Sequence, residues 1–282
     1  MKYGTVKVHY DMTGNPRKQG LEQYYTIQCV ADKLVQDAIR LIGKDYKWVE
    51  PTAGKGAFIE ALKKNGISDI TSYDIEPKHQ DVKYCDIIND TPDVSGRIAI
   101  GNPPFGRACN LAIKVFNALA DKGIEYIAFI VPPSFRKTSI LDRLHRNYHL
   151  IHNIPVPNVA FEDADGNPHI GGHLRTEFHI YRRRDDLRPL LNGYRSSHFR
   201  FVIKEDNPDI AIRTHGNNAG TVLQGLDYNP RTTAFIKLVS KDALHALNNA
   251  DYSYWKDATS YIPCISPAEM SYAVDDYIKV HS

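Results

Sequence analysis

The sequence predicts an α/β protein built on a mostly parallel sheet with helices on both faces. Short apolar runs alternate with segments of helical periodicity from about residue 21 to residue 184, a pattern typical of such a sheet. A glycine-containing turn follows the first apolar run, where a strand would pass into a helix. We therefore expect ligands to bind at the carboxyl edge of the sheet, where open α/β sheets place them.

The expected elements follow in chain order. Strands are expected at 47–50, 70–74, 82–85, 97–100, 124–131, 149–155 and 177–182. Helices are expected at 21–43, 57–64, 111–122 and 140–147. The first helix is indicated by apolar residues at Val30, Leu34 and Ala38, one per turn.

The chain is expected to divide into three parts. Residues 1–20 are polar and predict a flexible arm, and residues 21–184 carry the regular alternation. Residues 185–282 predict a small α+β extension, with short strands in 194–238 and helices in 240–282. Ser240 and Ser266 are expected to cap helices, the second with Pro267 and Glu269 completing a start signal.

Composition limits the class of protein. The chain has 282 residues, 42% of them apolar, and a formal net charge of only +2, so binding of nucleic acid would need a local basic face. Four scattered cysteines and no signal peptide predict a reducing, cytoplasmic location. No run approaches the length of a membrane span, so no membrane association is expected. His145 and His149 have helical spacing without cysteine or carboxylate partners nearby in sequence, and no metal site is expected.

The first motif is the turn from Glu50 to Phe58, which contains Gly54 and Gly56. Glycines allow a tight turn and a close approach of the backbone to a ligand. Amide groups at the start of the following helix can face a carboxylate or phosphate. Taken alone, the pattern equally fits a plain strand–turn–helix junction. Lys55, between the glycines, is expected to be exposed to solvent.

Two acidic residues stand at later strand ends. Asp74 lies 18 residues after Gly56, a spacing that suits a carboxylate that accepts hydrogen bonds from a pair of ribose hydroxyls. Asp86 follows the next short strand and could accept a hydrogen bond from an adenine amine. Either residue alone fits a solvated acid at the end of a strand.

The most informative motif is Asn102-Pro103-Pro104-Phe105, directly after an apolar strand. Two prolines fix the backbone and remove two N–H donors. The Asn102 side chain and main-chain carbonyls are then left as hydrogen-bond acceptors, and the Phe105 ring can stack on a flat base. The motif therefore indicates a site that accepts an amine.

These motifs, in this order, resemble the N6-adenine methyltransferases, in the group whose cofactor motifs precede the catalytic motif. The resemblance covers about residues 21–184 and implies a Rossmann-like catalytic domain that uses S-adenosylmethionine. Gln23 to Ala31 resembles the segment that closes over the methionine end of that cofactor. The implied catalytic residues are Asn102, Pro103, Pro104 and Phe105. The implied cofactor-binding residues are Tyr25, Thr26, Glu50, Pro51, Thr52, Ala53, Gly54, Gly56, Phe58, Asp74, Ile75, Asp86 and Ile87.

The resemblance implies methylation of adenine N6 in DNA, after extrusion of the base from the duplex. The same chemistry on RNA stays open, as does methylation of a protein glutamine, although glutamine methyltransferases typically carry tyrosine at the position of Phe105. An idle binding protein is disfavoured because both motif loops are intact. A separate restriction nuclease is compatible with the sequence as a partner.

Basic residues outside the motifs are the predicted contacts to nucleic acid. Phosphate contacts from arginine and lysine supply affinity without sequence choice. The selected residues are Arg136, Lys137, Arg183, Arg184 and Arg195. Residues 185–282 are the predicted target-recognition region, and the polar loop 159–175 is a predicted lid or substrate contact.

Overall fold

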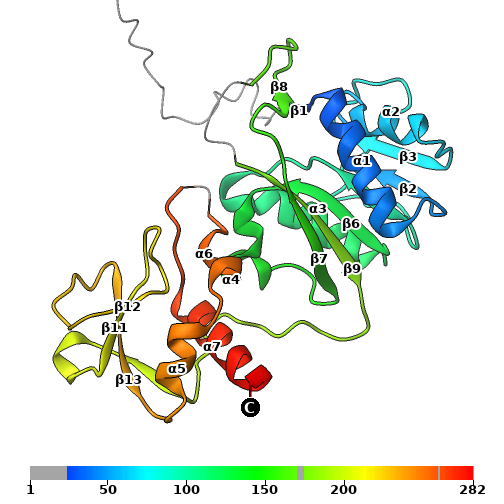
Figure 1. Ribbon diagram of the computed structural model, residues 1–282. Helices are drawn as coiled ribbons and strands as arrows, with labels where there is room; N and C mark the ends of the chain where they lie inside the picture. The colour runs from blue at the N-terminus through cyan, green and yellow to red at the C-terminus, as the bar shows by residue number, and fades with distance from the viewer. Residues whose placement is uncertain (1–23, 170–174, 260, 282) are drawn as a thin grey trace, which may run out of the picture.

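The computed structural model describes residues 24–169, 175–259 and 261–281. Its larger part is a seven-stranded sheet (Figure 1) in the order β4-β3-β2-β5-β6-β9-β7. The strands are β2 Trp48–Glu50, β3 Ile70–Asp74, β4 Lys83–Tyr84, β5 Ile98–Gly101, β6 Tyr126–Val131, β7 Tyr148–Pro155 and β9 Glu177–Arg183. Only β9 runs against its neighbours β6 and β7. The predicted fold class, a mostly parallel α/β sheet, is confirmed.

Helices cover both faces of this sheet. They are α1 Gln28–Ile42, α2 Ala57–Lys64 and α3 Asn110–Asp121. In β5, Ile98 and Ile100 pack with α1 and α2, whereas Ala99 between them packs with α3. Successive side chains of a strand point to opposite faces, and both faces are buried here. This double burial explains why the central strands are continuous apolar runs.

Most predicted elements lie within a few residues of the observed ones, but two helices were predicted too long. The first begins at Gln28, because Tyr25–Thr26 forms strand β1, which pairs with β8 Phe161–Glu162. The predicted helix 140–147 is only α4 Thr138–Leu141. The Arg188 guanidinium donates to the carbonyls of Leu141 and Leu144, which satisfies them outside a helix. His149 consequently lies in β7, and His145 and His149 do not share a helix.

Residues 199–281 form a second sheet with three helices. The sheet is antiparallel, in the order β10-β13-β11-β12. Its strands are β10 Phe199–Val202, β11 Ile210–Arg213, β12 Val222–Leu223 and β13 Thr233–Leu238, and the helices are α5 Ala243–Asn249, α6 Ser253–Lys256 and α7 Pro267–His281.

The two predicted caps in this part have opposite outcomes. Ser266 caps α7: its Oγ accepts from the Glu269 N–H at 3.3 Å, and the Glu269 carboxylate accepts from the Ser266 N–H at 2.9 Å. Ser240 is not a cap, because α5 begins at Ala243 and the Ser240 hydroxyl lies 2.9 Å from Nδ1 of His198.

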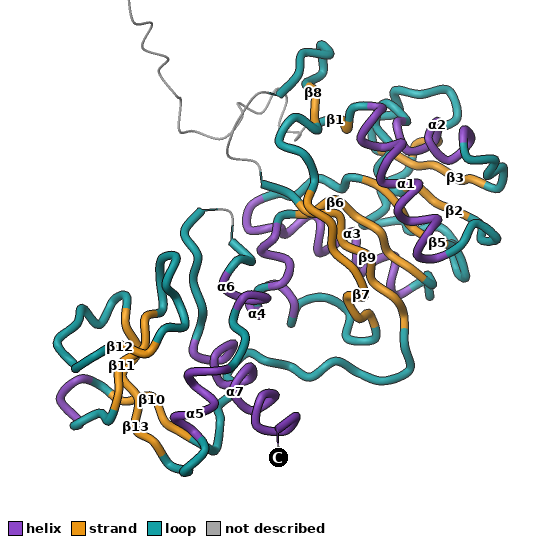
Figure 2. The backbone as a smooth tube through the Cα atoms, viewed as in Figure 1, coloured by secondary structure: helices purple, strands orange, loops and turns teal. Residues whose placement is uncertain are grey.

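The C-terminal part packs against the sheet at the segment after β6, as Figures 1 and 2 show. This segment contains the 3-10 helix η3 Pro133–Arg136 and α4. One continuous apolar cluster joins Phe135 and Leu141 to Met270 and Val274 of α7. Within the described ranges, no helix is long and apolar enough to cross a membrane. The predicted arm at 1–20 lies outside the described residues.

Candidate active site

A cleft of about 630 Å³ lies at the carboxyl ends of β2, β3 and β5. Every residue predicted to be catalytic or to bind a cofactor lines this cleft, with the exception of Gly56. Tyr24, from the predicted cofactor-closing segment Gln23 to Ala31, and Phe161, which lies outside the predicted motifs, line it as well. Residues from six separate stretches of sequence thus meet in one cleft.

The two glycines of the turn after β2 have different roles. Gly54 has φ +49°, and a Cβ there would lie 2.8 Å from Cε1 of Tyr25. Glycine at 54 therefore lets β1 approach the turn closely. Gly56 has φ +81° at the start of α2, and a Cβ there would lie 2.7 Å from Cγ of His79. Gly56 therefore serves the backbone turn and its packing, and it does not line the cleft.

Glu50 is a buried carboxylate at the end of β2, only 2% exposed. Its Oε2 accepts a hydrogen bond of 3.1 Å from the Ile59 N–H, and no described cation pairs with it. Burial raises the pKa of Glu50 well above its usual value, and the Ile59 hydrogen bond offsets this only in part. A cationic ligand group in the cleft would stabilise the ionised form.

This burial predicts a pH-dependent effect of Glu50→Gln. A raised pKa in the folded state gives stability that is present below the unfolded pKa and is lost as pH rises. We expect the wild-type free energy of unfolding to fall relative to the variant as pH rises above the ordinary value of 4.5. The difference in free energy of unfolding between the wild type and the variant should change by about 1.4 kcal/mol per pH unit while folded Glu50 stays protonated. Urea denaturation of both proteins, without ligand and from acidic to neutral pH, measures this difference. Equal changes of the two free energies of unfolding with pH would contradict the prediction.

Asp74 and Asp86 are held at the ends of β3 and β4 by short hydrogen bonds. Asp74 accepts from the Gly54 N–H at 2.7 Å and from the Glu76 N–H at 2.8 Å. Asp86 accepts from Asn89 Nδ2 at 2.7 Å and from the Ile88 N–H at 3.0 Å. The Asn89 hydrogen bond lowers the pKa of Asp86. Both carboxylates are therefore oriented at the cleft.

The Asn102 amide is oriented by the main chain. Its Nδ2 donates to the Tyr24 carbonyl at 3.0 Å, and no other described group bonds to the side chain. Because only the NH₂ group can donate to a carbonyl, this bond identifies Oδ1 as the remaining acceptor. The motif is anchored on its other side, where the Phe105 carbonyl accepts from the Leu111 N–H at 3.1 Å.

A strand pair beside the cleft holds Tyr24 in place. Figure 1 shows β1 and β8 side by side, with Thr26 paired to Phe161. Lys55 reaches across to β8, with its Nζ 2.7 Å from Oε1 of Glu162 and 4.7 Å from the centre of the Tyr25 ring. The expectation that Lys55 is exposed is wrong: its side chain is 31% exposed and joins the glycine turn to β8.

Two of the predicted nucleic-acid contacts, one buried and one partly buried, are paired with carboxylates inside the protein. Arg136 is buried and forms two hydrogen bonds of 3.0 and 3.1 Å with the Glu177 carboxylate. Lys137 pairs with buried Glu269 and donates to the Cys264 carbonyl. Cations already neutralised inside the protein cannot contact phosphates, so both assignments are corrected.

The other three predicted contacts are exposed but lie away from the cleft. Arg183 pairs in register with Tyr148, the first residue of β7, so Arg183 and Arg184 stand at the amino edge of the parallel strands. The cleft is at the carboxyl edge. Arg195 lies in the connection to β10 and does not line the cleft. None of the three is near the Asn102 loop.

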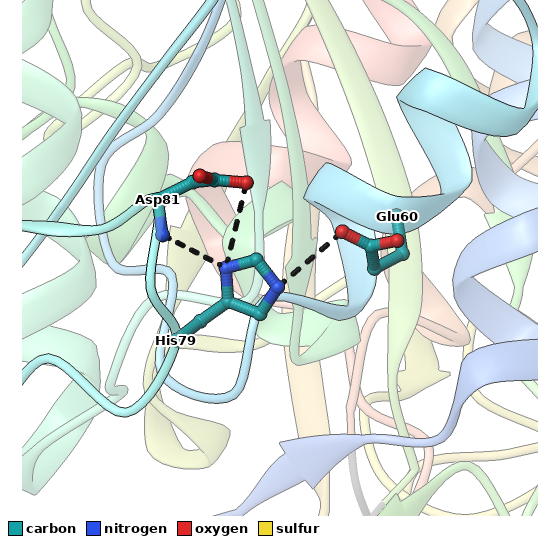
Figure 3. Close-up of side chains that lie close together, drawn as sticks. All are labelled: Glu60, His79 and Asp81. Carbon is teal, nitrogen blue, oxygen red and sulfur yellow. Dashed lines mark hydrogen bonds and ion pairs between the residues drawn. The ribbon is translucent and has the colours of Figure 1, made fainter.

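Glu60, His79 and Asp81 bring three ligand-type atoms within 4.8 Å of one another (Figure 3). His79 Nε2 lies 3.3 Å from Oε1 of Glu60. The Lys63 ammonium lies 2.8 Å from Glu60 and 2.6 Å from Asp81. Because Lys63 already neutralises both carboxylates, this cluster is an ion-pair network, and we assign no metal to it.

Comparison with known proteins gives structural likenesses only. No protein-family model and no curated protein sequence matches the chain. A protein assigned as an RNA methyltransferase from Pyrococcus horikoshii is similar with a TM-score of 0.44 and 18% identity, over 62% of this chain and 91% of that one.

Two further solved structures are similar over more than half of this chain. A 1,6-didemethyltoxoflavin-N1-methyltransferase from Burkholderia thailandensis, with bound S-adenosylhomocysteine, has a TM-score of 0.42 and 10% identity, over 56% of this chain and 80% of that one. The modification subunit assigned to a type I restriction enzyme of Vibrio vulnificus has a TM-score of 0.41 and 12% identity, over 59% of this chain and 46% of that one. All three TM-scores are below 0.5, so these likenesses support no inference about function.

Proposed function

We propose that this protein transfers a methyl group from S-adenosylmethionine to the N6 amine of adenine in DNA. The observation that carries the proposal is the Asn102 amide, whose orientation is set by the Tyr24 carbonyl and which leaves Oδ1 as an acceptor. This acceptor stands in the same cleft as Glu50, Asp74 and Asp86. One cleft thus combines an amine-accepting loop with a set of groups suited to a cofactor.

The lining of the cleft fits S-adenosylmethionine. Glu50 lacks a described cationic partner and suits the cofactor's ammonium group. The buried hydroxyls of Thr26 and Thr52 have no hydrogen-bond partner among the described residues and can donate to its carboxylate. Asp74 suits the ribose hydroxyls, and Asp86 suits the adenine amine. The pairings with Thr26 and Thr52 would satisfy buried hydroxyls that have no partner within the described residues.

The Asn102 loop supplies the chemistry that an adenine amine needs. The lone pair of this amine is delocalised into the ring, so the nitrogen is a poor nucleophile. Hydrogen bonds from the amine to Asn102 Oδ1 and to the Pro103 carbonyl draw the nitrogen toward tetrahedral geometry. The bound cofactor supplies an electrophilic methyl group on a sulfonium. Phe105 stacks on the base after its extrusion from the duplex.

The test is methyl transfer to matched substrates. Protein and labelled S-adenosylmethionine are incubated with a DNA duplex, an RNA strand of the same sequence and a glutamine-containing protein. We expect label in the DNA, at adenine N6, and binding of the cofactor measurable by calorimetry. Label in RNA alone would move the target to RNA, and label in the protein alone would overturn the assignment of a base as substrate. Absence of cofactor binding would overturn the enzyme class.

A further inference from the structure

The cleft has two halves of opposite charge. Glu50, Asp74, Glu76 and Asp86 line it from β2, β3 and the chain after β4. Arg107 and Lys114 line it from the other side, on the 3-10 helix η2 Arg107–Cys109 and on α3. S-Adenosylmethionine carries a sulfonium and an ammonium against one carboxylate, so it suits the acidic half. The carboxylate of this cofactor is already assigned to the Thr26 and Thr52 hydroxyls, so the cationic half suits an anionic group of a second ligand.

A third cation joins these two at the rim. Arg143 Nη2 donates to Oδ1 of Asn110, another residue of the cleft lining, at 2.7 Å. The Arg143 carbonyl accepts from Asn117 Nδ2 at 2.8 Å. Arg143 therefore spans two turns of α3, from Asn117 to Asn110. Lys114 lies between these residues on the same helix face, because positions four and three apart are neighbours.

No described carboxylate pairs with any of these three cations. Arg107, Lys114 and Arg143 are exposed, and none forms an ion pair within the described part of the chain. By contrast, Arg136 and Lys137, on the segment after β6, are fully paired. The first turn of α3 holds no acidic residue, and the Cys109 side chain does not cap the helix. The positive end of the helix dipole adds to the same field.

We infer that Arg107, Lys114 and Arg143 form a phosphate clamp that holds the nucleic-acid backbone beside the extruded adenine. This inference rests on the proposed function. Arg107 lies two residues after Phe105, the last residue of the catalytic motif. The Phe105 carbonyl accepts a hydrogen bond from the Leu111 N–H of α3. An extruded nucleotide keeps a phosphodiester on each side, so long cationic side chains at the rim of its pocket meet these groups first. Phosphate contacts of this kind fix position rather than sequence.

The test uses the double variant Arg107→Gln/Lys114→Gln and a matched control. The control, Arg183→Gln/Arg184→Gln, removes the same charge from the opposite edge of the sheet. Binding to a labelled DNA duplex and to RNA of the same sequence is measured by fluorescence anisotropy at salt concentrations from about 50 to about 200 mM. Thermal melting confirms that both variants fold.

We expect the clamp variant to bind DNA at least about tenfold more weakly and to lose about 2 units of the salt slope, because each phosphate contact contributes about 0.9. The control should keep wild-type affinity and slope. Equal losses in both variants, or no loss in the clamp variant, would overturn the clamp.

The proposed activity and the clamp fail in different ways. Loss of binding in the clamp variant, without methyl transfer by the wild type to either nucleic acid, would support the clamp and reject the activity. Methyl transfer with unchanged binding in the clamp variant would support the activity and reject the clamp. A wild-type protein that binds neither nucleic acid and methylates only an acidic protein would reject both.

Discussion

Replacement of Asn102 by alanine should reduce methyl transfer to adenine by roughly 100- to 1,000-fold, the cost of removing one well-placed hydrogen-bonding group that acts in the transition state. The side chain is half-buried in the cleft and makes one described hydrogen bond, from Nδ2 to the Tyr24 carbonyl. The loss should fall on kcat, because the interaction strengthens as the nitrogen becomes tetrahedral. Single-turnover transfer from labelled S-adenosylmethionine measures the effect.

A second variant separates the two roles of this amide. Asn102→Asp keeps an oxygen acceptor but loses the NH₂ donor to the Tyr24 carbonyl, and two acceptors then face each other. We expect it to be impaired as well, because the acceptor is no longer oriented. Asn248→Ala is the matched control: Asn248 also donates from Nδ2 to a main-chain oxygen, on α5 and outside the cleft lining. Normal transfer by Asn102→Ala, with normal folding, would refute the assigned role.

The sheet and its polar edge could be predicted from the sequence because their signals are local. The central strands β5 and β6 are short apolar runs, and the catalytic motif directly follows one, as Asn102 follows Ile98–Gly101. The carboxyl ends of parallel strands share one edge, so motifs far apart in the sequence had to converge there. Their convergence in one cleft follows from that rule.

Long-range pairing could not be predicted in the same way. Tyr24 and Phe161 reach the cleft through the pairing of β1 with β8. In the sequence, most strands of the seven-stranded sheet lie between these two segments. Lys55 binds Glu162, 107 residues away. Arg107 and Lys114 were missed because single charges on a helix resemble ordinary surface, and only the cleft shows that they face one site.

The same limit explains the error at Arg136. A basic pair after a buried strand resembles a phosphate contact, but the partner of Arg136 is Glu177, 41 residues later. Glu177 also lies 2.8 Å from Nε2 of buried His179, and Arg136 donates to the Tyr254 carbonyl. Arg136 therefore joins the start of β9 to α6 of the C-terminal part.

Arg136→Met should lower the free energy of unfolding by roughly 3–5 kcal/mol, because it leaves the Glu177 carboxylate buried without its cation. Arg183→Met, on an exposed strand end, should change it by less than about 0.5 kcal/mol. Urea denaturation of both variants measures the difference. A variant of Arg136 that keeps wild-type stability and binds nucleic acid more weakly would instead restore the phosphate-contact assignment.

The pH dependence gives an independent check on the same pair. Burial alone would raise the pKa of Glu177, but hydrogen bonds from His179 and Arg136 outweigh it and hold the pKa at about 2. A lowered pKa gives stability that is present above the unfolded value of 4.5 and is lost as pH falls toward 2. The wild type should lose stability across this interval, and Arg136→Met should lose less because its Glu177 has a higher pKa. Adding Glu177→Leu to Arg136→Met should recover part of the stability, since no unpaired charge then stays buried.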